Sequence, residues 1–456
     1  MPYDSNMQQA GYGAAAEAID RIRRVVQDRL SYDIASLPTD ATDETVRNMI
    51  VNAVSSIVQS GQFGNVSQED FNAIVQKLDD EFLGFGPIEP LLADESISEI
   101  MVNGGGFDEN GVQKPSRIFI ERSGKVSEVT NIKFDSEDHV VRIMNRIVGQ
   151  MGRHLDQANP IEDASLPDGS RFSGTVFPIS PDGSSFNIRK FQQDRLGYQD
   201  LINIGTFTLP QMQFLASAIM AKCSILISGG TGSGKTTLLN VLGGFIPADE
   251  RLVTIEDTCE LLLHKNHADV TRLQARKANS EGVGEVTLND LLVNTLRRRP
   301  DRIIVGECRG PEAYTMLEAM NTGHEGSMTT IHANDPVSAL TRLVTLVKQG
   351  DDGLSENTIK QKVADALDLV VQVQRLADGT RKCTSIQAIG GYSDGVIQHD
   401  ELWSFVRTGK DANGFFTGHH QPSGLQPAAV RKKIENAGLV YNINWLVEGS
   451  PEMGGR

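Results

Sequence analysis

The stretch Gly229-Gly230-Thr231-Gly232-Ser233-Gly234-Lys235-Thr236 decides the fold of this chain. It fits the P-loop pattern: a glycine, any four residues, then Gly-Lys-Ser/Thr. The apolar run 224–228 before it predicts a short buried strand, and residues 237–242 predict the helix that follows. A strand leading into a glycine-rich turn and a helix is the context that this phosphate-binding motif requires. The alternative, a chance match in a surface loop, would not explain that context.

The residue types of this loop suit a nucleoside triphosphate. Glycines let the phosphates approach the backbone, and the exposed N–H groups form an anion nest at a helix N-terminus. Lys235 adds a cation for the β- and γ-phosphates, and the Thr236 hydroxyl suits a Mg²⁺ ligand. We therefore predict an ATP site made by Gly229, Gly230, Thr231, Gly232, Ser233, Gly234, Lys235, Thr236 and Thr237.

Composition limits the class of protein. A length of 456 residues suggests about three domains. Acidic residues outnumber basic ones by 59 to 43, which argues against nucleic acid as a partner, although a local basic patch stays open. We find no signal peptide and no apolar run long enough to cross a bilayer. The four cysteines are widely spaced without a CxxC pair, so we expect reduced thiols and a cytosolic protein.

The first part of the chain predicts two domains. Residues 1–80 carry three apolar stripes at helical spacing, which predict a helical module behind a disordered start, a frayed tail at 1–12. Ser67 is the predicted N-cap of the third helix. Residues 81–196 mix short strands, near 99–102, 117–120, 174–179 and 186–191, with a helix around 140–147. This mixture predicts a smaller α+β domain.

Residues 197–456 predict the third domain, of the α/β class. Tyr198–Thr208 is interpreted as a linker, after which strands and helices alternate as in a mostly parallel sheet covered by helices. The predicted strands are 225–228, 252–255, 302–305, 328–331 and 369–373. Residues 411–426 are rich in glycine and polar groups and are interpreted as an ordered loop or linker, followed by a short helix at 428–437.

Two predicted strands end in acids. The strand 252–255 delivers Glu256, and a carboxylate there can polarise the water that attacks a γ-phosphate. The strand 302–305 is followed by Glu307, which resembles a Walker B acid that holds Mg²⁺, with Glu in place of the usual Asp. For each acid the alternative is an ordinary acidic turn at the surface.

Two histidines, His324 and His332, flank the strand 328–331. A histidine beside a γ-phosphate can donate a hydrogen bond to it and respond to its loss. The alternative is a histidine that is satisfied by structural hydrogen bonds. No cysteine or acid spacing accompanies the pair, which argues against a metal site.

Taken in order, these motifs resemble the secretion ATPase superfamily, and most of all the CpaF/TadA family of Tad (Flp) pilus assembly ATPases. The likeness runs from about Phe82 to Ile389. The stretches that carry it are 229–236, 254–260, 299–307 and 319–334, with 86–92, 166–171 and 188–191 upstream. The resemblance implies that Glu256 is the catalytic glutamate, that Glu307 is the Walker B acid that binds metal with Thr236, and that His324 and His332 form the His box. It also implies that Arg171 and Arg189 reach a nucleotide, often across a subunit boundary; their alternative is ordinary surface pairing.

The resemblance implies a RecA-like P-loop domain in a homo-hexamer that hydrolyses ATP with Mg²⁺. Such a motor would act on inner-membrane pilus platform proteins from the cytoplasmic face, associating with the membrane through these partners only. It would power Tad pilus assembly, with retraction left open. The alternatives are a type II or type IV secretion ATPase, a nucleic-acid translocase, and a nucleotide-binding scaffold without hydrolysis. The acidic balance and the lack of base-stacking aromatics argue against the translocase; Glu256 and Glu307 argue against the scaffold.

Overall fold

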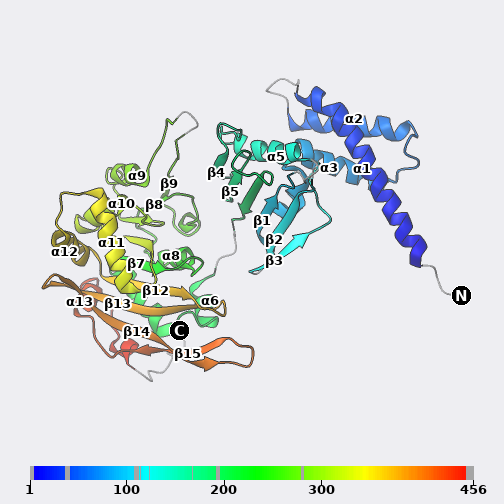
Figure 1. The fold of residues 1–456 in the computed structure, drawn as a ribbon. Helices are drawn as coiled ribbons and strands as arrows, with labels where there is room; N and C mark the ends of the chain where they lie inside the picture. The colour runs from blue at the N-terminus through cyan, green and yellow to red at the C-terminus, as the bar shows by residue number, and fades with distance from the viewer. Residues whose placement is uncertain are drawn as a thin grey trace. The chain divides into compact units, whose positions relative to one another are not determined.

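The computed structural model describes residues 5–35, 42–106, 112, 114–122, 124–166, 168–191, 196–278 and 282–447. The chain divides into two compact units, Met1–Gln192 and Gln193–Arg456 (Figure 1). Unit 1 therefore contains both the helical module and the α+β domain, whose predicted boundaries at residues 80 and 196 stay predictions. Residues 192–195, next to the second boundary, lie outside the described residues.

Unit 1 begins with three helices, α1 (Ser5–Ala35), α2 (Asp43–Gln59) and α3 (Gln68–Phe82). Their predicted apolar stripes pack together in one core, which includes Ile22, Val26, Ile50, Val54, Ile74 and Leu78. The Ser67 side chain accepts a hydrogen bond from the Asp70 N–H, so the predicted N-cap of α3 is present. Helix α1 begins at Ser5, inside the segment interpreted as a frayed tail; residues 1–4 of that segment lie outside the described residues.

The rest of unit 1 is an antiparallel sheet with a helix on one face. Its strand order is β3-β2-β1-β6-β5-β4. The strands are β1 (Ile97–Asn103), β2 (Arg117–Arg122), β3 (Lys125–Val129), β4 (Ile161–Ser165), β5 (Arg171–Thr175) and β6 (Ser185–Arg189). The 3-10 helix η1 (Gly86–Ile88) and the short helix α4 (Glu89–Ala93) precede β1, and helix α5 (Glu137–Gly149), which follows β3, covers the sheet. Its buried side chains, with Ile143 and Ile147 among them, share a core with Ile100, Ile118 and Phe172.

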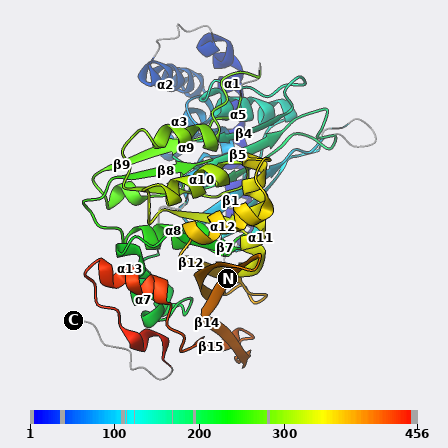
Figure 2. The ribbon, with the colours of Figure 1, turned by 90° about the vertical axis from the view of Figure 1, so that its left-hand side faces the viewer.

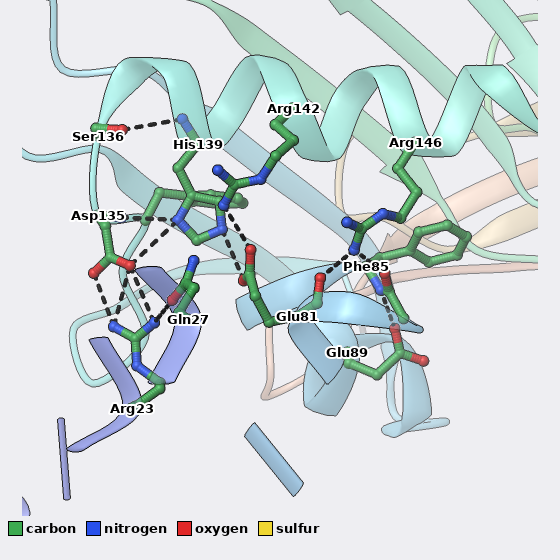
Figure 3. A network of polar contacts seen from close by, with 12 residues as sticks. Arg23, Gln27, Glu81, Phe85, Glu89, Asp135, Ser136, His139, Arg142 and Arg146 are labelled. Carbon is green, nitrogen blue, oxygen red and sulfur yellow. Dashed lines mark hydrogen bonds and ion pairs between the residues drawn. The ribbon is translucent and has the colours of Figure 1, made fainter. Parts of the chain in front are cut away.

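A polar network joins the helical module to this sheet domain (Figure 3). The buried His139 of α5 places its Nε2 atom 3.0 Å from Glu81 of α3, while its Nδ1 accepts from the Asp135 N–H. Arg142 donates to Glu81, and Arg23 of α1 donates to both carboxylate oxygens of Asp135. Burial opposes ionisation, but hydrogen bonds with Asp135 and Glu81 raise the pKa of His139. The network stabilises one arrangement of α1, α3 and α5 within unit 1.

Unit 2 is built on a sheet with the strand order β15-β14-β13-β12-β7-β11-β10-β8-β9. The strands are β7 (Ile225–Gly229), β8 (Leu252–Glu256), β9 (Val270–Gln274), β10 (Arg302–Val305), β11 (Met328–His332), β12 (Leu369–Arg375), β13 (Arg381–Ser393), β14 (Val396–Lys410) and β15 (Phe416–Pro422). From β12 to β9 all neighbours are parallel, whereas β12 to β15 form an antiparallel extension. This arrangement confirms the predicted α/β fold with a mostly parallel P-loop core.

Helices cover both faces of the parallel core. One face packs against α7 (Leu209–Met220), α8 (Lys235–Gly243) and α13 (Ala428–Asn436), and the other against α9 (Leu288–Thr295), α10 (Glu312–Asn321), α11 (Pro336–Gly350) and α12 (Glu356–Ala366). Alternation along β7 explains the division, because Ile225 and Ile227 belong to the first core and Leu226 to the second. Figure 2 shows α7 beside α13. Two 3-10 helices, η2 (Leu263–Lys265) and η3 (Ile443–Leu446), also belong to unit 2.

Two interpretations of the sequence are wrong in unit 2. The supposed linker contains helix α6 (Tyr198–Asn203), because the Asp200 carboxylate accepts from the Gly197 N–H and Leu201 is buried in the core. The supposed loop at 411–426 contains the edge strand β15, which pairs with β14. A half-exposed edge strand is stabilised mainly by pairing with its neighbour, so its own sequence need not show a strand pattern. The glycine-rich composition of this segment therefore did not predict β15.

Candidate functional site

The glycine-rich loop connects the end of β7 to the start of α8, as its sequence requires. Gly232 and Gly234 adopt positive φ angles of 67° and 96°, which favour glycine. At Gly229 a Cβ atom would lie 2.4 Å from the Val373 carbonyl oxygen of β12, so the neighbouring strand leaves no room for a side chain. Backbone conformation and strand packing therefore demand glycine at these positions before any ligand is considered.

Lys235, the first residue of α8, folds back over this loop. Its Nζ atom donates to the carbonyl oxygens of Gly229 and Gly230, each at 3.0 Å. Partial burial lowers the pKa of Lys235, with Glu307 acting in the opposite direction. The Ser233 hydroxyl also donates to the Gly230 carbonyl, at 2.9 Å. These hydrogen bonds stabilise the curved conformation of the loop at the N-terminus of α8. When a nucleotide binds, phosphate oxygens can replace the two carbonyl oxygens as hydrogen-bond partners of Nζ.

Glu256 and Glu307 lie at the same edge of the sheet as the loop. Strands β8 and β10 are parallel neighbours with Ile255 opposite Val305, so both strands end together. The Glu256 side chain is buried, and its Oε2 atom accepts from the N–H groups of Glu260 and Leu261 at 2.8 and 2.9 Å. Its Oε1 atom is buried without a hydrogen-bond partner among the described residues.

Burial raises the pKa of the Glu256 carboxyl to about 7, against the opposing effect of its two backbone hydrogen bonds. A group with a pKa near neutrality can take up and release a proton at physiological pH. With its free oxygen, this carboxylate has the properties of a general base.

Glu307 is bound by an arginine that the sequence reading did not single out. The Arg309 guanidinium donates to Glu307 at 2.8 Å and to Asp257 at 3.3 Å, and so bridges the loops after β10 and β8. Two features of the sequence could have indicated this arginine: it follows Glu307 by two residues, and a second acid, Asp257, follows β8. The spacing of two residues between Glu307 and Arg309 did not by itself predict their ion pair.

The residues present fit a Mg²⁺ ion held together with phosphates. Thr236 supplies a hydroxyl in the first turn of α8, and Glu307 supplies a carboxylate after β10. Within the described ranges, no group of three or more His, Cys, Asp or Glu side chains is arranged so that it could hold a metal ion by itself. A site with few protein oxygens, completed by substrate phosphates and water, is how Mg²⁺ is usually bound.

The two histidines lie at opposite ends of β11. His332 ends the strand opposite Gly229 of β7, which places it beside the glycine-rich loop. His324 precedes the strand, and nearby Gly326 lies against Lys222, in the turn before β7, and against the side chain of Arg302, the first residue of β10. The structure therefore brings His332, but not His324, to the edge with the loop and the two acids.

Arg171 and Arg189 belong to unit 1, where they form a cross-strand pair between β5 and β6. Directly opposite residues of an antiparallel pair share a face, so the two side chains leave the sheet on the same side. The buried Phe172 and Ile188 occupy the other face. The Arg189 side chain is 62% exposed and lies 3.8 Å from Glu99. No feature of the sequence indicated that these arginines would be neighbours.

Comparison with known proteins gives the family. A family model described as "Type II/IV secretion system protein" matches residues 81–422. The chain belongs to this family. The match spans the sheet domain of unit 1 and unit 2 as far as the end of β15, and it leaves out most of the helical module and the helix α13.

Two curated relatives and one solved structure are similar to this chain. A putative conjugal transfer protein of Mycobacterium tuberculosis is 32% identical over 337 residues, 73% of this chain and 91% of the relative. Conjugal transfer protein TrbB of Rhizobium radiobacter is 35% identical over 312 residues, 67% of this chain and 88% of the relative. The crystal structure of the VirB11 ATPase from the Brucella suis type IV secretion system, in complex with sulphate, is 28% identical with a TM-score of 0.36, covering 69% of this chain and 96% of that one.

Hydropathy adds one observation about membranes. In the part of the chain that the structure describes, no helix combines the length and the apolar character needed to cross a bilayer.

Proposed function

We propose that this chain hydrolyses ATP at the glycine-rich loop and uses the energy to drive a membrane-embedded secretion or pilus machine. The observation that carries the proposal is the buried Glu256 carboxylate, whose Oε1 atom has no partner among the described residues. Glu256 lies at the sheet edge that also carries the glycine-rich loop and Glu307.

The reaction follows from the roles of the side chains. The loop N–H groups and Lys235 bind the phosphates, and Glu256 accepts a proton from the water that attacks the γ-phosphorus. The bond between the γ-phosphorus and the bridging oxygen breaks, releasing ADP and phosphate. Thr236 and Glu307 would hold Mg²⁺, which when bound neutralises charge on the phosphate oxygens.

Three further side chains are proposed to act on the nucleotide. His332 lies beside the loop and can donate to a phosphate oxygen. Arg171 and Arg189 are proposed to add positive charge to the transferring phosphoryl group of a nucleotide, in a homo-hexamer in which subunits share sites. Their common face and their proximity in the sheet support a joint role.

The machine we propose is the Tad pilus. In this reading the chain is a cytoplasmic motor at the inner membrane that works on pilus platform proteins without binding nucleic acid. Its support is the ordered set of motifs that resembles the CpaF/TadA family. The second candidate is a type IV secretion or conjugation ATPase, and the names of the curated relatives favour it.

The activity is tested with the purified full-length chain. Wild type should hydrolyse ATP in the presence of Mg²⁺, while Lys235→Ala should lose both turnover and most nucleotide affinity. Lys432→Ala, on the exposed face of α13, is the matched control and should match wild type. Normal turnover in Lys235→Ala would refute the proposed site.

The choice of machine is tested in the source cells. Removal of the chain should abolish surface pili while leaving plasmid transfer and protein secretion intact, and wild type but not Glu256→Gln should restore the pili. Loss of transfer or secretion with normal pili would favour the second candidate.

A further inference from the structure

Two arginines beside the glycine-rich loop have no part in the reaction described so far. Arg375 ends β12 and Arg381 begins β13, and the two face each other across the hairpin that joins these strands. Since β12 is the neighbour of β7, with Val373 opposite Gly229, this hairpin lies directly beside the loop.

The contacts of these arginines are with the second half of the loop. The Arg381 Nε atom donates to the Gly232 carbonyl at 2.9 Å, and its Cδ atom lies 3.6 Å from where a Gly234 Cβ would be. An Arg375 Nη atom lies 3.7 Å from the corresponding position at Gly232. Arg381 therefore packs along the loop, and Arg375 reaches its surface.

Neither guanidinium is neutralised by a neighbouring acid. Among the described residues no carboxylate forms an ion pair with Arg375 or Arg381, and both side chains reach solvent. Asp378, the only acid in the hairpin turn, accepts from Thr380 and from the Phe416 N–H instead. Burial, and then repulsion by Arg375, lower the pKa of Arg381. Two adjacent cations without a neighbouring carboxylate, next to an anion nest, favour the binding of an anion.

Strand order indicates which part of the nucleotide faces them. Strand β7 lies between β12, which carries Arg375, and β11, beyond which β10 and β8 lead to Glu307 and Glu256. The γ-phosphate must point toward the acids, because the attacking water and Mg²⁺ are needed there. The opposite end of the phosphate chain then lies on the β12 side, next to Gly232 and Gly234.

We propose that Arg375 and Arg381 bind the α-phosphate end of the nucleotide and so supply affinity shared by ATP and ADP. The proposal rests on the proposed function, because it assumes that the loop binds a nucleoside triphosphate. The two arginines act in binding, while Glu256 and Glu307 act in hydrolysis. A charge-assisted hydrogen bond to phosphate is worth about tenfold to hundredfold in affinity, so each arginine should contribute about that factor.

The test is calorimetric titration of the full-length chain with ADP and with a non-hydrolysable ATP analogue. Arg375→Ala and Arg381→Ala should each weaken both ligands by the same factor, about tenfold to hundredfold. At saturating ATP, kcat should stay within about twofold of wild type while KM rises. Arg381→Ala also removes a hydrogen bond to the Gly232 carbonyl and could change the loop conformation. Arg375→Ala avoids this effect, since Arg375 forms no hydrogen bond to the loop among the described residues. Arg431→Ala, an exposed arginine of α13 paired with Glu435, is the control and should change nothing.

The outcomes separate this inference from the proposed function. Normal ADP affinity in both arginine variants, with Lys235→Ala defective, would overturn the inference and leave the function standing. Weakened binding of the ATP analogue alone, or loss of kcat with normal ADP affinity, would place the arginines at the γ-phosphate and also overturn it. A wild-type chain that binds neither ligand would refute the proposed function itself.

Discussion

Glu256→Gln separates the chemistry of the site from its stability. Glutamine keeps the size of the side chain, and its oxygen can still accept from the Glu260 and Leu261 N–H groups. It cannot take a proton from water, so turnover should fall by about 10²-fold or more with ATP affinity retained. In wild type, turnover should decline as the pH falls below about 7, because the carboxyl then becomes protonated.

The same substitution has a calculable effect on the free energy of unfolding. The ordinary pKa of the carboxyl is 4.5, and burial raises it to about 7. Between these values the folded chain keeps a proton that the unfolded chain has lost, so the stability of wild type falls as the pH rises through this window. At about 1.4 kcal/mol per pKa unit, the loss from pH 5 to pH 8 is about 2 to 3 kcal/mol. Glutamine does not titrate, and the variant should escape this loss.

Tryptophan fluorescence reports this effect selectively. The chain has two tryptophans, Trp403 and Trp445, and both are buried in the core of unit 2 that surrounds β7. Urea unfolding at pH 5 and pH 8, without nucleotide or Mg²⁺, gives the free energy for wild type and Glu256→Gln, with Glu285→Gln as an exposed control. Glutamine leaves a buried NH₂ group that costs about 1 to 3 kcal/mol at any pH, so the pH dependence is the diagnostic quantity. An identical pH dependence in wild type and variant would refute a burial-raised pKa at this residue.

Three further sets of substitutions test separate parts of the structure. Gly229→Ala should lower the stability of unit 2 by about 1 to 3 kcal/mol, because its Cβ would meet the backbone of β12; Gly230→Ala, with open space around it, should be near neutral in the same urea titration. The raised pKa of His139 stabilises unit 1 below its unfolded value of 6.5, and this contribution is lost as the pH rises through the folded pKa. The opening free energy of α3, from hydrogen exchange corrected for chemical exchange rates, should therefore decrease between pH 6 and 9 in wild type; an equal decrease in His139→Gln would contradict this assignment. Arg171→Ala and Arg189→Ala should each lower turnover about 10³-fold or more with unchanged unfolding midpoints, whereas exposed surface pairs would be worth about 1 kcal/mol or less and leave turnover nearly normal. Mixing Arg189→Ala with Glu256→Gln subunits should restore part of the activity, and no rescue in subunits shown to exchange would contradict a shared site.

The sequence by itself determined the elements whose signals are local. The order Gly229 to Thr236 between an apolar strand and a helix predicts the P-loop, because backbone conformation and phosphate approach restrict the residue types within eight positions. The strands of the parallel core are short and buried on both faces, so short runs of mostly apolar and β-branched residues revealed β7, β8, β10, β11 and β12. Their ends also pointed to Glu256 and Glu307, since the carboxyl ends of parallel strands share an edge.

Only the tertiary structure decided which distant residues meet. Strand order places Arg375 and Arg381 against the loop, although more than 130 residues separate them from it in the chain. The edge strand β15 and the cross-strand pair Arg171 and Arg189 likewise depend on pairing with neighbours. Burial also sets the pKa of Glu256, and burial is a property of the packed core. The physical reason is common to all of these: local sequence specifies backbone conformation, whereas charge neutralisation, strand pairing and solvent exclusion are created when segments far apart in the chain pack together.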